Sequence, residues 1–116
     1  MNKIESAHDV FWLARYAHNT LDPLFKAARQ YEPSLYLVMQ MNFSGATLTE
    51  NSVSVFGHWD RDRMFLYAPT LRTTAGVDKA AAKVQKFIDT EQAKLEAAHD
   101  AAVSYFISTV KTGIAA

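Results

Sequence analysis

The chain has 116 residues, of which 49% are hydrophobic and 21% charged, a balance typical of one folded domain with a modest core. Lys plus Arg equals Asp plus Glu, at 12 each, and the resulting zero net charge disfavours a dedicated polyanion binder. The sequence contains no cysteine, which excludes disulfides, thiolate metal sites and cysteine nucleophiles. We therefore expect a single domain over residues 1–116.

The N-terminal segment, Met1 to Glu5, lacks the charged and then apolar run of a signal peptide. No apolar run approaches the ~20 residues needed to span a bilayer. We therefore expect a cytoplasmic protein with no membrane partner. A small domain of this kind fits an accessory protein of a phage or mobile element, although no motif specifies that source.

The first predicted helix covers residues 5–30. Apolar side chains recur there at alternating intervals of three and four residues, which indicates one buried face: Ala7, Val10, Ala14, Ala17, Leu21, Leu24 and Ala28. Pro23 lies inside this pattern and lacks the amide proton that a helix uses, and Asp22-Pro23 is also a suitable start for a second helix. Because the pattern stays in phase across Pro23, we expect a kinked helix or two nearly collinear helices that end before Glu32-Pro33.

Three strands are predicted to follow, over residues 34–43, 52–59 and 63–68. In the first, Leu35, Leu37 and Met39 alternate with residues that point to the other face. Asp60-Arg61-Asp62 forms a short turn between the second and third strands, and Pro69 is expected to end the third. Short connections between consecutive strands favour an antiparallel meander.

The last third of the chain predicts one long helix, because no Pro or Gly occurs from Val77 to Thr112. About 36 residues at 1.5 Å each give a helix of about 54 Å. A compact domain of this size is only about 35 Å across, given a radius of gyration near 13 Å. The helix is therefore expected to overhang its own domain and to pack against a second copy or another partner.

The predicted fold class is α+β: a two-layer sandwich in the order kinked helix, three-stranded antiparallel meander, long helix, with the helices on one face of the sheet. We expect a homodimer in which the long helices pair. Apolar residues on one row of the long helix, with one carboxylate among them, are the predicted interface: Val77, Val84, Ile88, Glu91, Leu95 and Tyr105. Burial of Glu91 there requires a partner, for instance Lys94 or Gln92 of the other copy.

The outer face of the sheet is the second candidate surface. Residues expected there are largely aromatic: Tyr36, Phe56, Phe65 and Tyr67. An open face of this kind is unlikely to remain in water. It is either a stacking platform for single-stranded nucleic acid or a flat ligand, a protein-binding surface, or a face covered by a second subunit or by the N-terminal helix.

Two polar clusters are weak candidates for chemistry. His58, Asp60 and Asp62 alternate at the hairpin and could hold a divalent metal, although a solvated charged turn is the favoured interpretation. Glu96, His99 and Asp100 share a face of the long helix, where an exposed surface is again favoured. A buried pair involving His8 and Asp9, or His18, could titrate near neutral pH, although exposed histidines are favoured.

A row of basic residues marks the start of the long helix: Arg72, Lys79, Lys83 and Lys86. The order helix, three strands, helix resembles that of the double-stranded RNA-binding domain, in which basic residues at this place contact phosphates. The resemblance covers element order only. The basic cluster of that family is replaced here by Asp78-Lys79-Ala80-Ala81-Ala82-Lys83.

The leading hypothesis is a non-enzymatic binding protein without a cofactor, acting as a homodimer. It would bind another protein as an adaptor or inhibitor, or a small apolar ligand beside Met39 and Met41. The alternative is a nucleic-acid-binding module that uses the lysine row or the aromatic sheet face. A metal-dependent enzyme that uses the His58 cluster is the third hypothesis.

Overall fold

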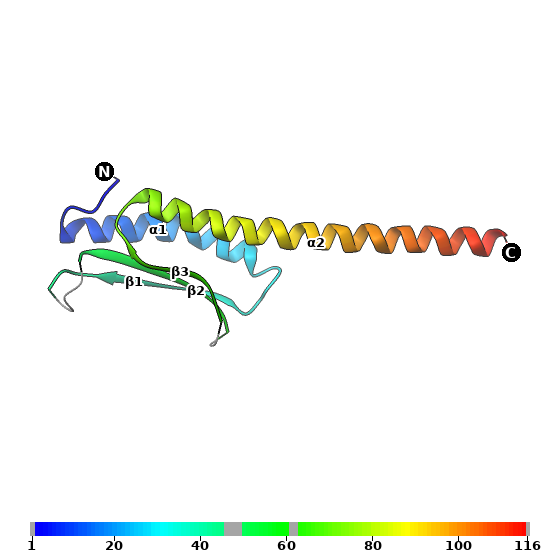
Figure 1. Ribbon diagram of the computed structural model, residues 1–116, viewed down its shortest axis with the longest axis horizontal. Helices are drawn as coiled ribbons and strands as arrows, with labels where there is room; N and C mark the ends of the chain where they lie inside the picture. Colours follow the sequence, from blue (N-terminus) through cyan, green and yellow to red (C-terminus); the bar gives the residue numbers. More distant parts are fainter. Residues whose placement is uncertain (1, 46–49, 61–62, 116) are drawn as a thin grey trace.

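A computed structural model describes residues 2–45, 50–60 and 63–115, of which residues 111–115 are described as backbone only. The elements follow in the order α1 (Ala7–Ala28), β1 (Leu35–Asn42), β2 (Ser52–Trp59), β3 (Arg63–Leu71) and α2 (Thr74–Ala115). Both helices lie on the same side of the sheet, and α2 runs far beyond it (Figure 1). The α+β class predicted from the sequence is confirmed.

The sheet is an antiparallel meander with β2 in the centre, in the order β1-β2-β3. The prediction that Pro69 ends the third strand is wrong, because β3 continues to Leu71. Val55 pairs with Ala68 but Val53 pairs with Leu71, so one extra residue of β3 bulges out in between. An edge strand tolerates proline at such a bulge, since its amide is not needed by a neighbouring strand.

The first helix is one continuous element that includes Pro23, and its bounds are narrower than the predicted 5–30. Asp9 fixes its start: the Asp9 carboxylate Oδ2 accepts hydrogen bonds from the backbone amides of Glu5 (2.8 Å) and Ser6 (3.1 Å). These bonds satisfy backbone donors that lie at the helix N-terminus. Leu13, which the predicted apolar row omitted, is fully buried, whereas Ala7 is exposed.

The start of α2 is fixed by Thr73, whose Oγ1 accepts a hydrogen bond of 3.1 Å from the amide of Gly76. The extended residues before α1 pair with the β3–α2 connection. The amide of Ile4 donates to the carbonyl of Arg72 (2.8 Å), and the Ile4 side chain is buried. The sequence reasoning assigned no role to these residues, which join the chain start to the β3–α2 connection.

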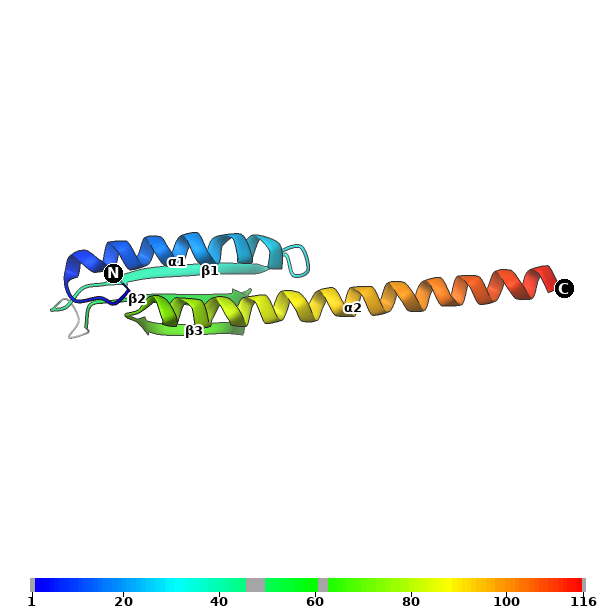
Figure 2. The ribbon, with the colours of Figure 1, turned by 90° about the horizontal axis from the view of Figure 1, so that it is seen from above.

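The core lies between the helices and the sheet. Seen from above, α1 runs over β1 and α2 runs over β3 (Figure 2). Phe25 of α1 and Phe65 of β3 meet beneath them, with ring centroids 5.5 Å apart. Gly57 of β2 lies below these rings, and a Cβ there would be 2.6 Å from the Phe65 ring and 2.9 Å from the Phe25 ring. Glycine at position 57 therefore lets the aromatic side chains approach the sheet closely.

The molecule is elongated, with principal extents of 78 × 30 × 15 Å and a Cα radius of gyration of 20.8 Å. A compact domain of this length has a radius of gyration of about 13 Å. The difference arises from α2, whose 42 residues exceed the 36 predicted. Within the part of the chain that the structure describes, neither helix has a stretch apolar enough to cross a membrane.

Candidate functional site

The most conspicuous surface is the part of α2 that leaves the body, residues 92–110, which we call the overhang. This segment projects beyond α1 and the sheet (Figure 1), and every residue in it is exposed. Three of its apolar side chains are among the most exposed large hydrophobic residues that the structure describes: Leu95 at 62%, Tyr105 at 75% and Phe106 at 67%. Leu95, Ala98, Ala102 and Tyr105 continue, at three- and four-residue spacing, the row that packs into the core nearer the helix start. The overhang therefore prolongs a core-forming helix face into solvent.

The structure corrects half of the predicted interface. Val77, Val84 and Ile88 are buried in the core of their own chain and are not available to a partner. Their spacing matched that of the exposed residues, so the sequence pattern could not show where the body ends. Of the six predicted interface residues, Leu95 and Tyr105 are exposed.

Glu91 lies at the junction between the body and the overhang. Its carboxylate Oε1 accepts a hydrogen bond of 3.1 Å from the Lys94 ammonium of the same chain. Glu91 was expected to need a partner from another copy, and here Lys94 supplies one from within the helix. Both residues border an open hollow of about 540 Å³, which we call the corner hollow, lined by Gln30, Tyr31, Glu91, Lys94, Leu95 and Ala98.

The outer sheet face is the second apolar surface, and neither helix covers it (Figure 1). The rings of Tyr36 and His58 stack there with centroids 5.0 Å apart, and Phe56 lies 5.7 Å from Tyr67. Phe65 does not belong to this group. Its ring packs on the opposite side against Phe25 and against other core aromatics, because a register shift between Gly57 and His58 interrupts the alternation.

The predicted metal cluster is not assembled by the residues that the structure describes. The His58 ring stacks on Tyr36, and the Asp60 carboxylate lies 3.9 Å from the Arg63 guanidinium. Asp60 has a φ of 48°, which suits a turn, and Asp62 lies outside the described residues. No group of three His, Asp or Glu side chains within the described ranges could hold a metal ion.

The remaining polar candidates lie apart from one another. Glu96, His99 and Asp100 are exposed on the overhang, where Glu96 accepts a hydrogen bond from Gln92. His8 and His18 are exposed on α1. Asp9 is buried, but its carboxylate holds the backbone at the start of α1 instead of pairing with a histidine.

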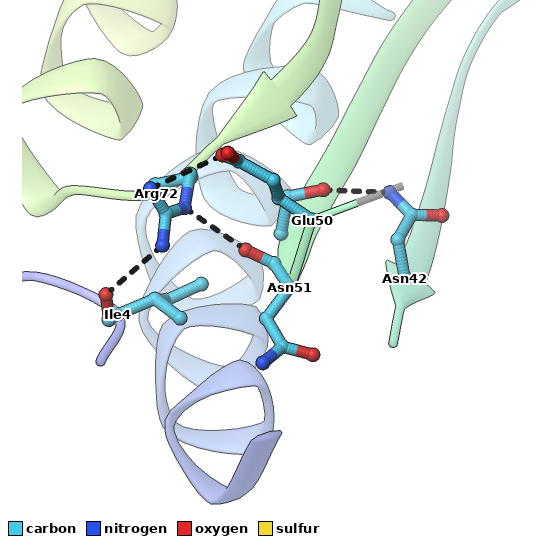
Figure 3. A network of polar contacts seen from close by, with 6 residues as sticks. Ile4, Asn42, Glu50, Asn51 and Arg72 are labelled. Carbon is cyan, nitrogen blue, oxygen red and sulfur yellow. Dashed lines mark hydrogen bonds and ion pairs between the residues drawn. The ribbon is translucent and has the colours of Figure 1, made fainter. Parts of the chain in front are cut away.

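Arg72 was a candidate nucleic-acid contact under the alternative hypothesis, but its guanidinium is engaged within the chain. It forms an ion pair with Glu50 (3.2 Å), and donates hydrogen bonds to the carbonyls of Asn51 (3.1 Å) and Ile4 (3.4 Å), as Figure 3 shows. These contacts tie the N-terminal residues, the start of β2 and the β3–α2 connection together. Arg72 is therefore a structural clamp.

The three lysines of the predicted basic row are exposed on α2. Lys79 and Lys83 border a shallow hollow of about 200 Å³ beside β3, which Tyr67 and Leu71 also line. Lys86 follows one turn later on the same helix face. The structure thus keeps the lysines together but removes Arg72 from the group.

One polar contact between the helices had no sequence signal. The Tyr16 hydroxyl of α1 donates a hydrogen bond of 2.6 Å to Asp78 Oδ1 of α2. This bond raises the pKa of Tyr16 above its ordinary value, because it holds the phenolic proton against the Asp78 carboxylate; desolvation and the negative charge act in the same direction. Residues 62 positions apart cannot be paired from spacing within one helix.

Comparison of the chain with protein-family models, with curated proteins and with solved structures finds no match.

Proposed function

We propose that the chain is a non-enzymatic protein-binding domain that acts as a homodimer, and that two copies associate through their overhangs. The observation that carries this proposal is the exposure of Leu95, Tyr105 and Phe106 on a helix face that elsewhere forms the core. A row of large apolar side chains on a projecting helix is an arrangement that favours association. Zero net charge removes the long-range repulsion that would oppose it.

The available area supports a dimer of modest affinity. Aromatic side chains bury about 150–250 Å² each, and Tyr105 and Phe106 are 75% and 67% exposed, so the four rings of two overhangs would remove roughly 400–700 Å² from water. Small specific interfaces bury about 1,200 Å² in total. The two aromatic residues of each copy therefore provide about half of the buried area of a small specific interface, before the area of Leu95 and of the alanines is added.

Light scattering behind size exclusion, at several protein concentrations, tests the proposal. We expect a mass of about 26 kDa, twice the 13.0 kDa of one chain. The double variant Leu95→Asp, Tyr105→Asp should elute at the mass of one chain, because each substitution places a charge in the apolar row. A matched control, Ala97→Asp with Ser104→Asp, adds the same charges to the opposite face of the overhang and should remain dimeric.

Two results would contradict the proposal: a wild-type mass of 13.0 kDa at every concentration, or a Leu95→Asp, Tyr105→Asp variant that remains dimeric. The outer sheet face is the competing surface for self-association. Replacement of Tyr36 and Tyr67 by serine removes two exposed rings from that face and should leave the dimer mass unchanged. The outer sheet face would then remain available to a second protein.

Nucleic-acid binding is the alternative function, and one observation favours it: Lys79 and Lys83 border the same hollow as Tyr67. Phosphate contacts make affinity fall steeply with salt. Fluorescence anisotropy of a labelled single-stranded oligonucleotide at low and at physiological salt tests it directly. Salt-dependent binding that is lost in a Lys79→Glu, Lys83→Glu variant would establish this alternative.

A further inference from the structure

Charge is distributed unevenly along the second half of α2. Four carboxylates and one lysine lie between positions 89 and 100: Asp89, Glu91, Lys94, Glu96 and Asp100. No charged residue occurs from position 101 to 110. Of these carboxylates, Glu91 lies on the apolar row, so a parallel pair in register would place the two Glu91 side chains near each other, and like charges facing each other oppose association. An antiparallel pair would place the acidic part of one helix beside the uncharged part of the other.

Side-chain size is also distributed unevenly along the same face. The part nearer the body carries small residues after Leu95, with Ala98 and Ala102 on the row, whereas the distal part carries Tyr105 and Phe106. In a parallel pair, alanine would face alanine and leave space, while the bulky rings would meet one another. In an antiparallel pair the distal part with its bulky rings lies along the part that carries Ala98 and Ala102, so that Phe106 faces an alanine and the two helices can approach closely.

From these two distributions we propose that the overhangs of two copies pair antiparallel, with the two-fold axis near Ala102. This inference rests on the proposed homodimer and specifies its geometry. The axis pairs Leu95 of one copy with Thr109 of the other, and Ala98 with Phe106. The distal turns of each α2 then lie along the partner's overhang and reach the corner hollow beside Gln30 and Tyr31.

The corner hollow is the part of the surface that this arrangement completes. Within one chain it is open, and Leu95 and Ala98 line it together with residues that follow α1. The partner's Phe106 enters beside Ala98, and it closes the hollow with an apolar side chain. Each copy therefore contributes residues to two equivalent closed sites, one at either end of the paired helices, as a two-fold interface requires.

Spin-label distances distinguish the two orientations, and the chain has no native cysteine to interfere with labelling. Thr90 and Ser104 are exposed on α2 and lie off the apolar row. With the axis near Ala102, two labels at position 90 are separated by about 36 Å along the helices, and two labels at position 104 by about 6 Å. In a parallel pair neither position has a separation along the helices, so both would give similar distances, set by an interhelical distance of about 8–10 Å and by the position of the labels on the outer faces.

The experiment uses the full chain as Thr90→Cys and, as its matched control, Ser104→Cys, with double electron–electron resonance at a dimer-forming concentration. We expect a distance of about 36 Å or more at position 90 and a clearly shorter distance at position 104. Similar distances at both positions would overturn the antiparallel geometry while the homodimer survives. No intermolecular distance at either position, together with a monomeric mass, would overturn the homodimer and the geometry together.

Discussion

Ile88 and Leu95 lie seven residues apart on the same face of α2, and they provide the sharpest comparison that the chain offers. Ile88 is 8% exposed, in the core, and Leu95 is 62% exposed, on the overhang. Replacement by alanine removes three carbon atoms in each case. The structure therefore predicts that two substitutions of equal size affect different properties: Ile88→Ala the stability of the fold, and Leu95→Ala the association of two copies.

Ile88→Ala should lower the free energy of unfolding by about 2–5 kcal/mol, because it removes buried methyl groups and leaves a cavity. Leu95→Ala should change the stability of a single chain by less than about 0.5 kcal/mol, since no core contact is lost. Urea unfolding followed by circular dichroism measures both. A Tyr105→Asp background keeps the chain monomeric on our proposal and prevents dimer formation from contributing to the apparent stability.

In the otherwise wild-type chain, Leu95→Ala should act on association instead. Burying three methylene equivalents contributes about 2.4 kcal/mol, and the 62% of Leu95 that is exposed accounts for about 1.5 kcal/mol of this. Because a dimer contains the substitution twice, its association free energy should weaken by about 3 kcal/mol, which raises the dissociation constant roughly a hundredfold. Sedimentation equilibrium measures this constant. An unchanged dissociation constant would refute the role of the overhang, and an Ile88→Ala loss below about 1 kcal/mol would refute the described core.

Three further predictions concern the body. Gly57→Ala should cost about 1–3 kcal/mol of unfolding free energy, because its Cβ would meet the rings above it, and a variant as stable as the wild type in urea would contradict this. Arg72→Ala should lower the free energy of unfolding by about 1–3 kcal/mol, since it removes charge-assisted hydrogen bonds to the carbonyls of Asn51 and Ile4. Thermal unfolding measures this loss, and Arg15→Ala, on the exposed surface of α1, is the control that should leave the unfolding temperature nearly unchanged. Because the pKa of Tyr16 is raised in the folded chain, its hydrogen bond stabilises the fold at neutral pH, and this stabilisation is lost as the pH rises through the raised pKa. Asp78→Asn should therefore shift the Tyr16 titration, followed by phenolate absorbance and identified by comparison with Tyr16→Phe, to lower pH. A Tyr16 titration that does not shift would contradict the contact.

The element order was predictable because local patterns determine it. Alternation with period two located β1 and β2, and an uninterrupted helix-forming composition located α2. The errors arose where tertiary context decides. Pro69 stops a strand by propensity, but β3 lies at an edge of the sheet and absorbs it in a bulge.

The candidate surfaces were predictable only in part, for a similar reason. The apolar row of α2 keeps the same spacing from Val77 to Tyr105, with Glu91 as its one charged member, so the spacing does not distinguish the buried part of the row from the exposed part. Burial of Val84 and exposure of Leu95 emerge only when α1 and the sheet are placed beside the helix. The clamp at Arg72 joins residues far apart in sequence, and nothing in the local spacing around Arg72 indicated it.

Small-angle X-ray scattering of the full chain tests the central claim most directly, because it reports mass and maximum dimension together. The distance from the two-fold axis near Ala102 to the end of α2 is about 20 Å, at 1.5 Å per residue. With a chain 78 Å long, each copy then extends about 58 Å from the axis, giving a dimer of about 115 Å and about 26 kDa. A particle of 13.0 kDa whose maximum dimension stays near 78 Å at every concentration would contradict the account.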